Sequence, residues 1–238
     1  RSQLGADLFR KCIKTYLERH RSGIVSTDDL QDVVEEVSGL SFDQFFDQWL
    51  HHGGVPELKV DHNWDAAAKL AKITVRQTQK LSEQVRLFRV PLPVSFKVAG
   101  QKEPIRFTMD VSKEVEDFHF TLPAQPELVR IDPDFTVLAK ISFTPPGPML
   151  DKQLESDLIG RLLAVQTLDR KHIAKLGQIL REDKFHAVRS EAAKVLAKLG
   201  EPEARAALIA NSGNQKHAAT RKAVVQALAS LHTHESRE

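Results

Sequence analysis

The stretch from Ser41 to Val60, SFDQFFDQWLHHGGVPELKV, contains a change from helix to strand. Its large apolar side chains recur at intervals of three and four residues, which predicts one buried helical face made of Phe42, Phe45, Phe46, Trp49 and Leu50. Ser41, with Gln44 three residues later, predicts a capping box at the start of this helix.

Glycine and proline predict where this helix ends. Gly53-Gly54 suits the left-handed backbone at a helix C-terminus, and Pro56 prevents the helix from resuming. Leu58 and Val60 then begin the alternation of a β-strand. The sequence therefore predicts a helical segment over residues 1–54 and a β-domain that begins at residue 55.

Two further amphipathic helices are predicted upstream. The first has an apolar stripe made of Leu8, Phe9, Cys12, Ile13, Tyr16 and Leu17. Ser26 or Thr27 is expected to cap the second, whose buried face is made of Leu30, Val33, Val34 and Val37. Three short helices, about fifty residues in all, bury too little surface for an independent core. We therefore expect them to pack on helices that precede Arg1 in a longer protein, here called the parent.

Residues 55–143 show the alternation of an all-β domain. Apolar residues at every second position predict about seven short strands, and turn residues separate them. Pro91 and Pro93 predict a strand edge or a bulge. This pattern is typical of an antiparallel β-sandwich, and it contains no cluster of catalytic side chains, so we expect the domain to act as a spacer.

A proline-rich linker, residues 144–148, precedes a repetitive helical region over residues 149–238. Residues 184–200 align with residues 216–232, and a weaker copy ends at Leu168. A repeat of this length resembles the helical pairs of HEAT proteins. The predicted fold is therefore multidomain α + β: a short helical segment, an antiparallel β-sandwich and a C-terminal α-solenoid of HEAT-like helix pairs.

Composition narrows the possible partners. The chain carries 34 Lys and Arg residues and 32 Asp and Glu residues, so its overall electrostatic field is too weak to attract nucleic acid or anionic lipid. No segment approaches the roughly 18 apolar residues of a membrane span. The single cysteine, Cys12, excludes an internal disulfide. We expect a soluble protein with no nucleic acid or membrane partner, and the sequence does not indicate its compartment.

One motif carries a family resemblance. The pattern F-D-Q-W-L-x-x-G-G-x-P-x-L-x-V, residues 46–60, resembles the aminopeptidase-N-like zinc metallopeptidases at the junction between their helical catalytic domain and a β-sandwich. The run RIDPDFTVLAKISF, residues 130–143, is similar to the end of that sandwich. The resemblance implies that the parent is a zinc-dependent aminopeptidase that removes N-terminal residues from peptides. It also implies that the C-terminal helices cover the catalytic cleft.

The zinc site of that family has no counterpart in this sequence. The family binds zinc through His-Glu-x-x-His and a distant Glu. No histidine here begins this motif: His234 precedes Glu235, but Glu238 occupies the position of the second histidine. We therefore predict no catalytic, cofactor-binding or metal residue in this chain, and expect the zinc in the missing catalytic part of the parent.

Arg189 and Arg221 are the candidate peptide contacts, because they occupy the same position in two repeats. A structural interpretation pairs them with acidic residues such as Asp183 or Glu191. A functional interpretation has them bind a peptide carboxylate along the solenoid. Both interpretations remain open from the sequence.

The sequence thus predicts a non-catalytic C-terminal segment whose partners are the parent's own catalytic domain and, in the parent, a peptide substrate. The helical region is short for a cleft cover, so it is alternatively a docking surface. A rival hypothesis is a protein-protein interaction scaffold of this architecture without peptidase activity, as in a subunit of a general transcription initiation complex. The residues that decide between the two hypotheses lie upstream of Arg1.

Overall fold

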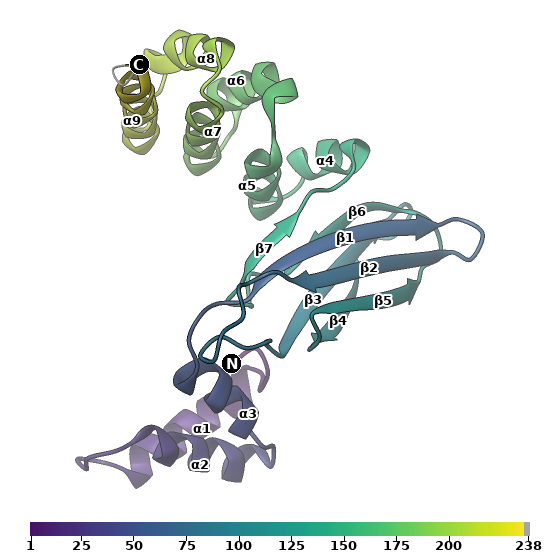
Figure 1. Cartoon of the computed structure of the whole chain (residues 1–238), viewed down its shortest axis with the longest axis vertical. Helices are drawn as coiled ribbons and strands as arrows, with labels where there is room; N and C mark the ends of the chain where they lie inside the picture. Colours follow the sequence, from purple (N-terminus) through teal and green to yellow (C-terminus); the bar gives the residue numbers. More distant parts are fainter. Residues whose placement is uncertain (236–238) are drawn as a thin grey trace.

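The computed structural model describes residues 1–235. Figure 1 shows three parts in a row: N-terminal helices, a two-sheet sandwich and a C-terminal array of helices. The predicted fold class is confirmed by this arrangement. No helix in the described part of the chain has the length and apolar character needed to cross a membrane.

The N-terminal helices are α1 (Ala6–Arg19), α2 (Thr27–Ser38) and α3 (Asp43–Phe46). Ser26 caps α2 in a capping box with Asp29, as Ser and Asp do when each satisfies a free backbone N–H. Their small core contains Cys12, Val34, Phe42 and Phe46. Cys12 is therefore a buried apolar side chain, as predicted.

The helix predicted from Phe42 to Leu50 departs from expectation in its second half. After α3 the chain continues as a π-helical turn, η1 (Asp47–His51). This wider turn rotates later side chains away from the 3.6-residue stripe, so Leu50 is exposed while Gln48 is buried. Phe45, which precedes the turn in α3, is also partly exposed. The predicted capping box is also wrong, because the Gln44 amide bonds to Gln48 at 2.9 Å instead of to the helix start.

The sandwich has seven strands within the described residues, and they form two sheets of order β5-β2-β1-β7 and β4-β3-β6. The strands are β1 (Glu57–Asp65), β2 (Leu70–Gln77), β3 (Val90–Val98), β4 (Ile105–Val111), β5 (Val115–Thr121), β6 (Pro126–Ile131) and β7 (Lys140–Phe143). All pairings are antiparallel except that of β1 with β7. The apolar positions of both sheets meet in one core around Phe96.

Two prolines lie in β3, which is the central strand of its sheet. Pro91 and Pro93 pair with β4, but pairing with β6 begins only at Val94. Pairing on that side extends one residue beyond β6, where the Asp132 N–H donates to the Pro93 carbonyl at 2.8 Å, so only Pro91 lies beyond it. The predicted strand edge or bulge at these prolines is therefore wrong: β3 is the central strand, and its register shift lies between Lys97 and Val98.

Buried glutamines fasten the loop of residues 78–89 to the sandwich and the helices. The Gln77 amide accepts from the Phe88 N–H at 2.9 Å and donates to the Phe88 carbonyl at 2.7 Å. Gln48 makes the same two kinds of bond to Arg89. Each side chain thus acts as a strand partner would, satisfying backbone groups that no neighbouring strand reaches.

The C-terminal array consists of helix pairs, and two of its helices begin with proline in the first turn. The helices are α4 (Gly147–Leu154), α5 (Leu158–Thr167), α6 (Ile173–Glu182), α7 (His186–Leu199), α8 (Pro202–Ser212) and α9 (Ala218–Glu235), with a short 3-10 turn η2 (Arg170–His172) before α6. One apolar core runs through the array and includes Leu176, Leu196 and Leu208.

Helix α4 connects the array to the sandwich. Met149 packs in the sandwich core, whereas the next residue, Leu150, packs in the core of the array. Arg130 of β6 adds an ion pair to Asp157, the N-cap of α5, at 2.7 Å. These contacts place the N-terminal helices and the array at opposite ends of the sandwich (Figure 1).

Candidate functional site

No described residue forms part of a group of three or more His, Cys, Asp or Glu side chains that could hold a metal ion. His51 is exposed, and the Nδ1 atom of half-buried His52 lies 3.8 Å from Asp47. Tyr16 packs against the ring of His20. The zinc that the resemblance implies therefore has no fitting ligand set in residues 1–235; Glu238 lies outside them.

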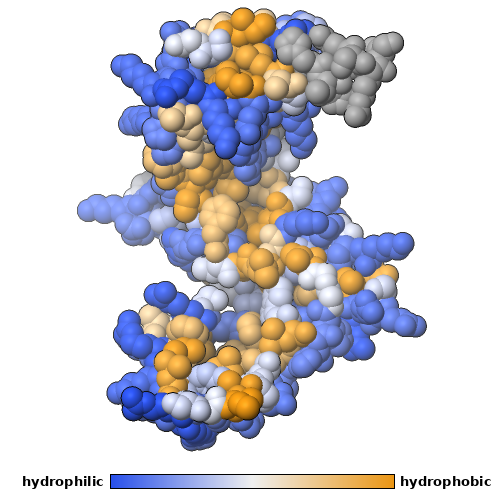
Figure 2. Space-filling view, turned by 90° about the vertical axis from the view of Figure 1, so that its left-hand side faces the viewer, coloured by the Kyte–Doolittle hydropathy of each residue, from blue (hydrophilic) through white to orange (hydrophobic). Residues whose placement is uncertain are grey.

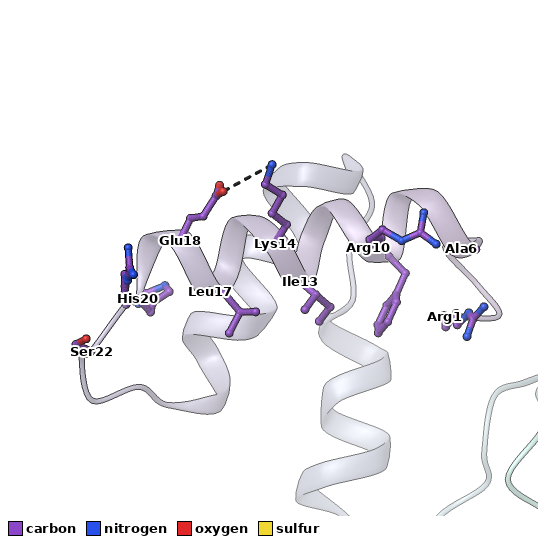
Figure 3. Close-up of a pocket in the computed structure, with 11 residues that line it drawn as sticks. Arg1, Ala6, Arg10, Ile13, Lys14, Leu17, Glu18, His20 and Ser22 are labelled. Carbon is purple, nitrogen blue, oxygen red and sulfur yellow. Dashed lines mark ion pairs between the residues drawn. The ribbon is translucent and has the colours of Figure 1, made fainter.

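An open depression of about 880 Å³ lies along α1 (Figure 3). Ile13 and Leu17 project from one side of the helix, and the ion pair between Lys14 and Glu18 lies on the other side. Leu17, a member of the predicted apolar stripe, is 62% exposed. The opposite face of α1 contributes Cys12 to the small core of this segment.

Helix α1 is therefore apolar on two sides, and only one side is covered. A helix of this kind normally lies between two layers of a larger core. Figure 2 shows apolar surface over the N-terminal helices, at the bottom of the view. The α1 face, defined as Phe9, Ile13 and Leu17, is thus the first candidate functional surface of the chain, and it suits a helical partner.

The second candidate surface contains Arg189 and Arg221, which the structure places at equivalent points of α7 and α9. Arg189 Nη1 donates to the Asp183 carbonyl at 2.5 Å, and Arg221 Nη1 donates to the Lys216 carbonyl at 2.7 Å. The predicted pairing with acidic side chains is wrong, because backbone carbonyls of the preceding loop hold both arginines. The carboxylate of Glu191 binds Lys194 instead.

Arg161 is the equivalent residue of α5 and differs from the other two in its charge balance. It donates to the Ser156 carbonyl at 3.0 Å and also pairs with the Asp183 carboxylate at 3.0 Å. No described carboxylate forms such a pair with Arg189 or Arg221. Two of the three equivalent arginines therefore keep an uncompensated positive charge.

Two histidines lie beside these arginines. The rings of His186 and His217 stack with centroids 3.7 Å apart and planes 21° apart. Burial lowers the pKa of His217, and the neighbouring His186, Arg189 and Arg221 lower that pKa further. The basic cluster, defined as His186, Arg189, His217 and Arg221, is the second candidate surface.

The repeat signal located the arginines but missed the histidine stack. The alignment that matches Arg189 with Arg221 places His186 opposite Ala218, one residue beyond His217. The stack crosses this register because His217 lies in the loop before α9. The α1 face was visible in the sequence as the apolar stripe of the first helix.

Comparison with known proteins agrees with this architecture. Residues 161–238 match the family model of HEAT repeats. Crystallised aminopeptidase A of Legionella pneumophila, in complex with aspartic acid, superimposes with a TM-score of 0.65 and 13% identity, covering 98% of this chain and 34% of that one. This likeness establishes the fold.

Sequence relatives include three aminopeptidases. Aminopeptidase 2 of Candida albicans is 23% identical over 142 residues, which are 60% of this chain and 15% of that protein. Puromycin-sensitive aminopeptidase of Caenorhabditis elegans is 24% identical over 170 residues, 70% and 17% of the two chains. Aminopeptidase N of Lactobacillus helveticus is 30% identical over 112 residues, 43% and 12% of the two chains. The matched part is thus below a fifth of each relative, and the predicted resemblance to aminopeptidases is confirmed.

Proposed function

We propose that this chain, which resembles aminopeptidases over a small share of their length, is the non-catalytic C-terminal segment of a zinc-dependent aminopeptidase. The observation that carries the proposal is the uncovered α1 face. Helix α1 buries Cys12 on one side and exposes Leu17 on the other. A helix that is apolar on both sides is completed by a second layer of helices packed on its exposed side. The proposed missing half is the parent's catalytic domain, which would supply the zinc and hydrolyse N-terminal residues from peptides.

The three parts of the chain then have separate roles. The N-terminal helices attach the segment to the catalytic domain, and the sandwich acts as a spacer. The array is held at the far end of that spacer by Met149 and by the pair of Arg130 with Asp157. It covers the catalytic cleft or docks a partner, and Arg189 and Arg221 are its proposed contacts with peptide.

A paired activity assay tests the peptidase proposal. This chain and its parent are each incubated with zinc and a panel of aminoacyl fluorogenic amides, with and without a chelator. We expect hydrolysis by the parent only, and loss of that hydrolysis with the chelator, because the zinc ligands lie outside this chain. Chelator-sensitive hydrolysis by this chain alone contradicts the proposal. An inactive, folded, zinc-replete parent supports the interaction scaffold.

Replacing Leu17 by Glu in the parent tests the α1 face. In this chain alone the change is expected to alter the free energy of unfolding by less than about 0.5 kcal/mol, because Leu17 is exposed. In the parent it buries a charge in an apolar interface, so we expect a loss of about 3 kcal/mol or more and lower peptidase activity. Ile24→Glu is the control, since Ile24 is fully exposed and outside the depression. Equal melting temperatures of the two parent variants would contradict the predicted interface.

A further inference from the structure

The basic cluster has a fixed geometry because hydroxyl groups join the starts of α7 and α9. Thr220 of α9 donates its hydroxyl to the His186 carbonyl at 3.1 Å, and Ser190 of α7 donates to the same carbonyl at 2.9 Å. Thr220 is fully buried. These bonds hold the His186 ring against the His217 ring and keep two arginines from different repeats on one surface.

Both arginines are positioned without being neutralised. In each, the bonds to the protein run from Nη1 to backbone carbonyls, although a guanidinium offers five N–H donors. The other donors are therefore available to an anion, and the backbone bond has already restricted the side chain. Arg161 differs from both, because its guanidinium already forms an ion pair with the Asp183 carboxylate.

His217 adds a titratable imidazole to the cluster. Its Nδ1 atom accepts from the Ala219 N–H at 3.3 Å, which requires an unprotonated Nδ1. The charged or titratable groups that act on it are His186 and Arg189 of α7 and Arg221 of α9, all basic. Lys184 and Lys216 precede the two histidines in sequence, and the nearby acid, Asp183, is already paired with Arg161.

We infer that the basic cluster binds carboxylate side chains of an acidic polypeptide segment, and that this binding strengthens as the pH falls below neutral. The inference rests on the peptide contact proposed above for the class of partner, but it requires no peptidase activity. A polypeptide fits better than a nucleic acid, because the whole chain has a net charge of only +2 and the cluster spans two repeats. Nucleic acids are normally bound through many phosphate contacts.

The direction of the pH effect follows from linkage. In the free chain, burial and the basic neighbours lower the pKa of His217 from its ordinary value and so favour the neutral ring. A bound carboxylate favours the imidazolium and raises this pKa, so the complex takes up a proton that the free chain does not hold. Affinity therefore rises as the pH falls, until the free chain is protonated as well. Glutamate side chains of the partner, with an ordinary pKa of about 4.3, remain largely ionised at about pH 5.5.

Fluorescence anisotropy with a labelled ten-residue Glu/Gly peptide tests the inference on the full chain. We expect affinity to rise about threefold from pH 7.5 to pH 5.5 and to weaken with added salt. The double variant Arg189→Gln/Arg221→Gln is expected to bind about tenfold more weakly. The matched control, Arg181→Gln/Lys198→Gln, removes the same charge from exposed positions outside the cluster and is expected to bind normally. A Gln/Gly peptide is expected not to bind.

Two further measurements separate binding from folding. His217→Gln is expected to lose the increase in affinity between pH 7.5 and pH 5.5, with circular dichroism showing that the helices persist. In the unmodified chain, the NMR titration of His217 is expected to shift to higher pH when the Glu/Gly peptide is present. The inference is overturned by equal binding of both double variants, by an unshifted His217 titration, or by tighter binding of a ten-residue single-stranded oligonucleotide. None of these results depends on the peptidase assay, so the two proposals fail separately.

Discussion

Replacing Phe96 by alanine is expected to lower the free energy of unfolding of the sandwich by about 3–5 kcal/mol, the usual range for a buried Phe→Ala change. Phe96 lies on the central strand β3 and is completely buried. Its ring contacts Phe107 of β4 at 6.1 Å and Phe120 of β5 at 5.4 Å between centroids. Because β4 and β5 belong to different sheets, the change removes an aromatic contact between the two layers and leaves a cavity.

Denaturant titration followed by tryptophan fluorescence measures this effect. Both tryptophans, Trp49 and Trp64, lie in or beside the sandwich, and the array contains none. Fluorescence therefore reports the sandwich, while helical circular dichroism is dominated by the array. Phe135→Ala is the control, since 61% of Phe135 is exposed and little change in stability is expected. Similar midpoints for the two variants would show that Phe96 does not connect the layers as described.

Replacing Gln77 by leucine is expected to cost about 3 kcal/mol, although leucine is similar in size and more apolar. The Gln77 amide bonds to the N–H and carbonyl of Phe88, and its oxygen also accepts from Gln79 at 3.0 Å. Leucine would leave these buried groups without partners, and each such group costs about 1–3 kcal/mol. The loop of residues 78–89 is expected to detach before the sheets unfold.

Hydrogen exchange at the Phe88 amide measures the loss directly, alongside the fluorescence midpoint. The matched control is Gln166→Leu, because Gln166 is exposed on α5 and, within the described residues, its side chain bonds only to that of Glu191, at 3.0 Å. A Gln77→Leu variant with unchanged stability and a still-protected Phe88 amide would mean that the loop finds other partners.

The sequence predicted those elements whose signal is local. Alternation at Leu92, Val94 and Phe96 identified β3, and the choice of Ser26 or Thr27 as cap placed the start of α2 to within one residue, because period and capping depend on near neighbours. It could not predict the π-helical turn at Asp47–His51, because a wider turn leaves the composition of the helix unchanged. The parallel pairing of β1 with β7 joins residues far apart in the sequence, and no local pattern indicates it.

The candidate surfaces were likewise predictable only where their signal is local in the sequence. The 32-residue repeat led to Arg189 and Arg221, but acidic neighbours in the sequence suggested partners that the structure replaces with backbone carbonyls. Such bonds are invisible to sequence reasoning, because every residue carries a carbonyl. The exposure of Leu17 also required the structure, since an apolar stripe does not indicate which of its members is covered.

Met149 and Leu150 are neighbours in α4 but pack in different cores, so this helix helps to set the angle between the sandwich and the array. Neighbouring residues of an α-helix point about 100° apart, so helix geometry alone sets the angle between the directions toward the two cores. The orientation of the array therefore depends on this short helix, together with the ion pair of Arg130 with Asp157. Moving the apolar residue from position 150 to the next position would turn the side chain that faces the array by about 100° around α4, so the array would have to pack at a different angle to the sandwich.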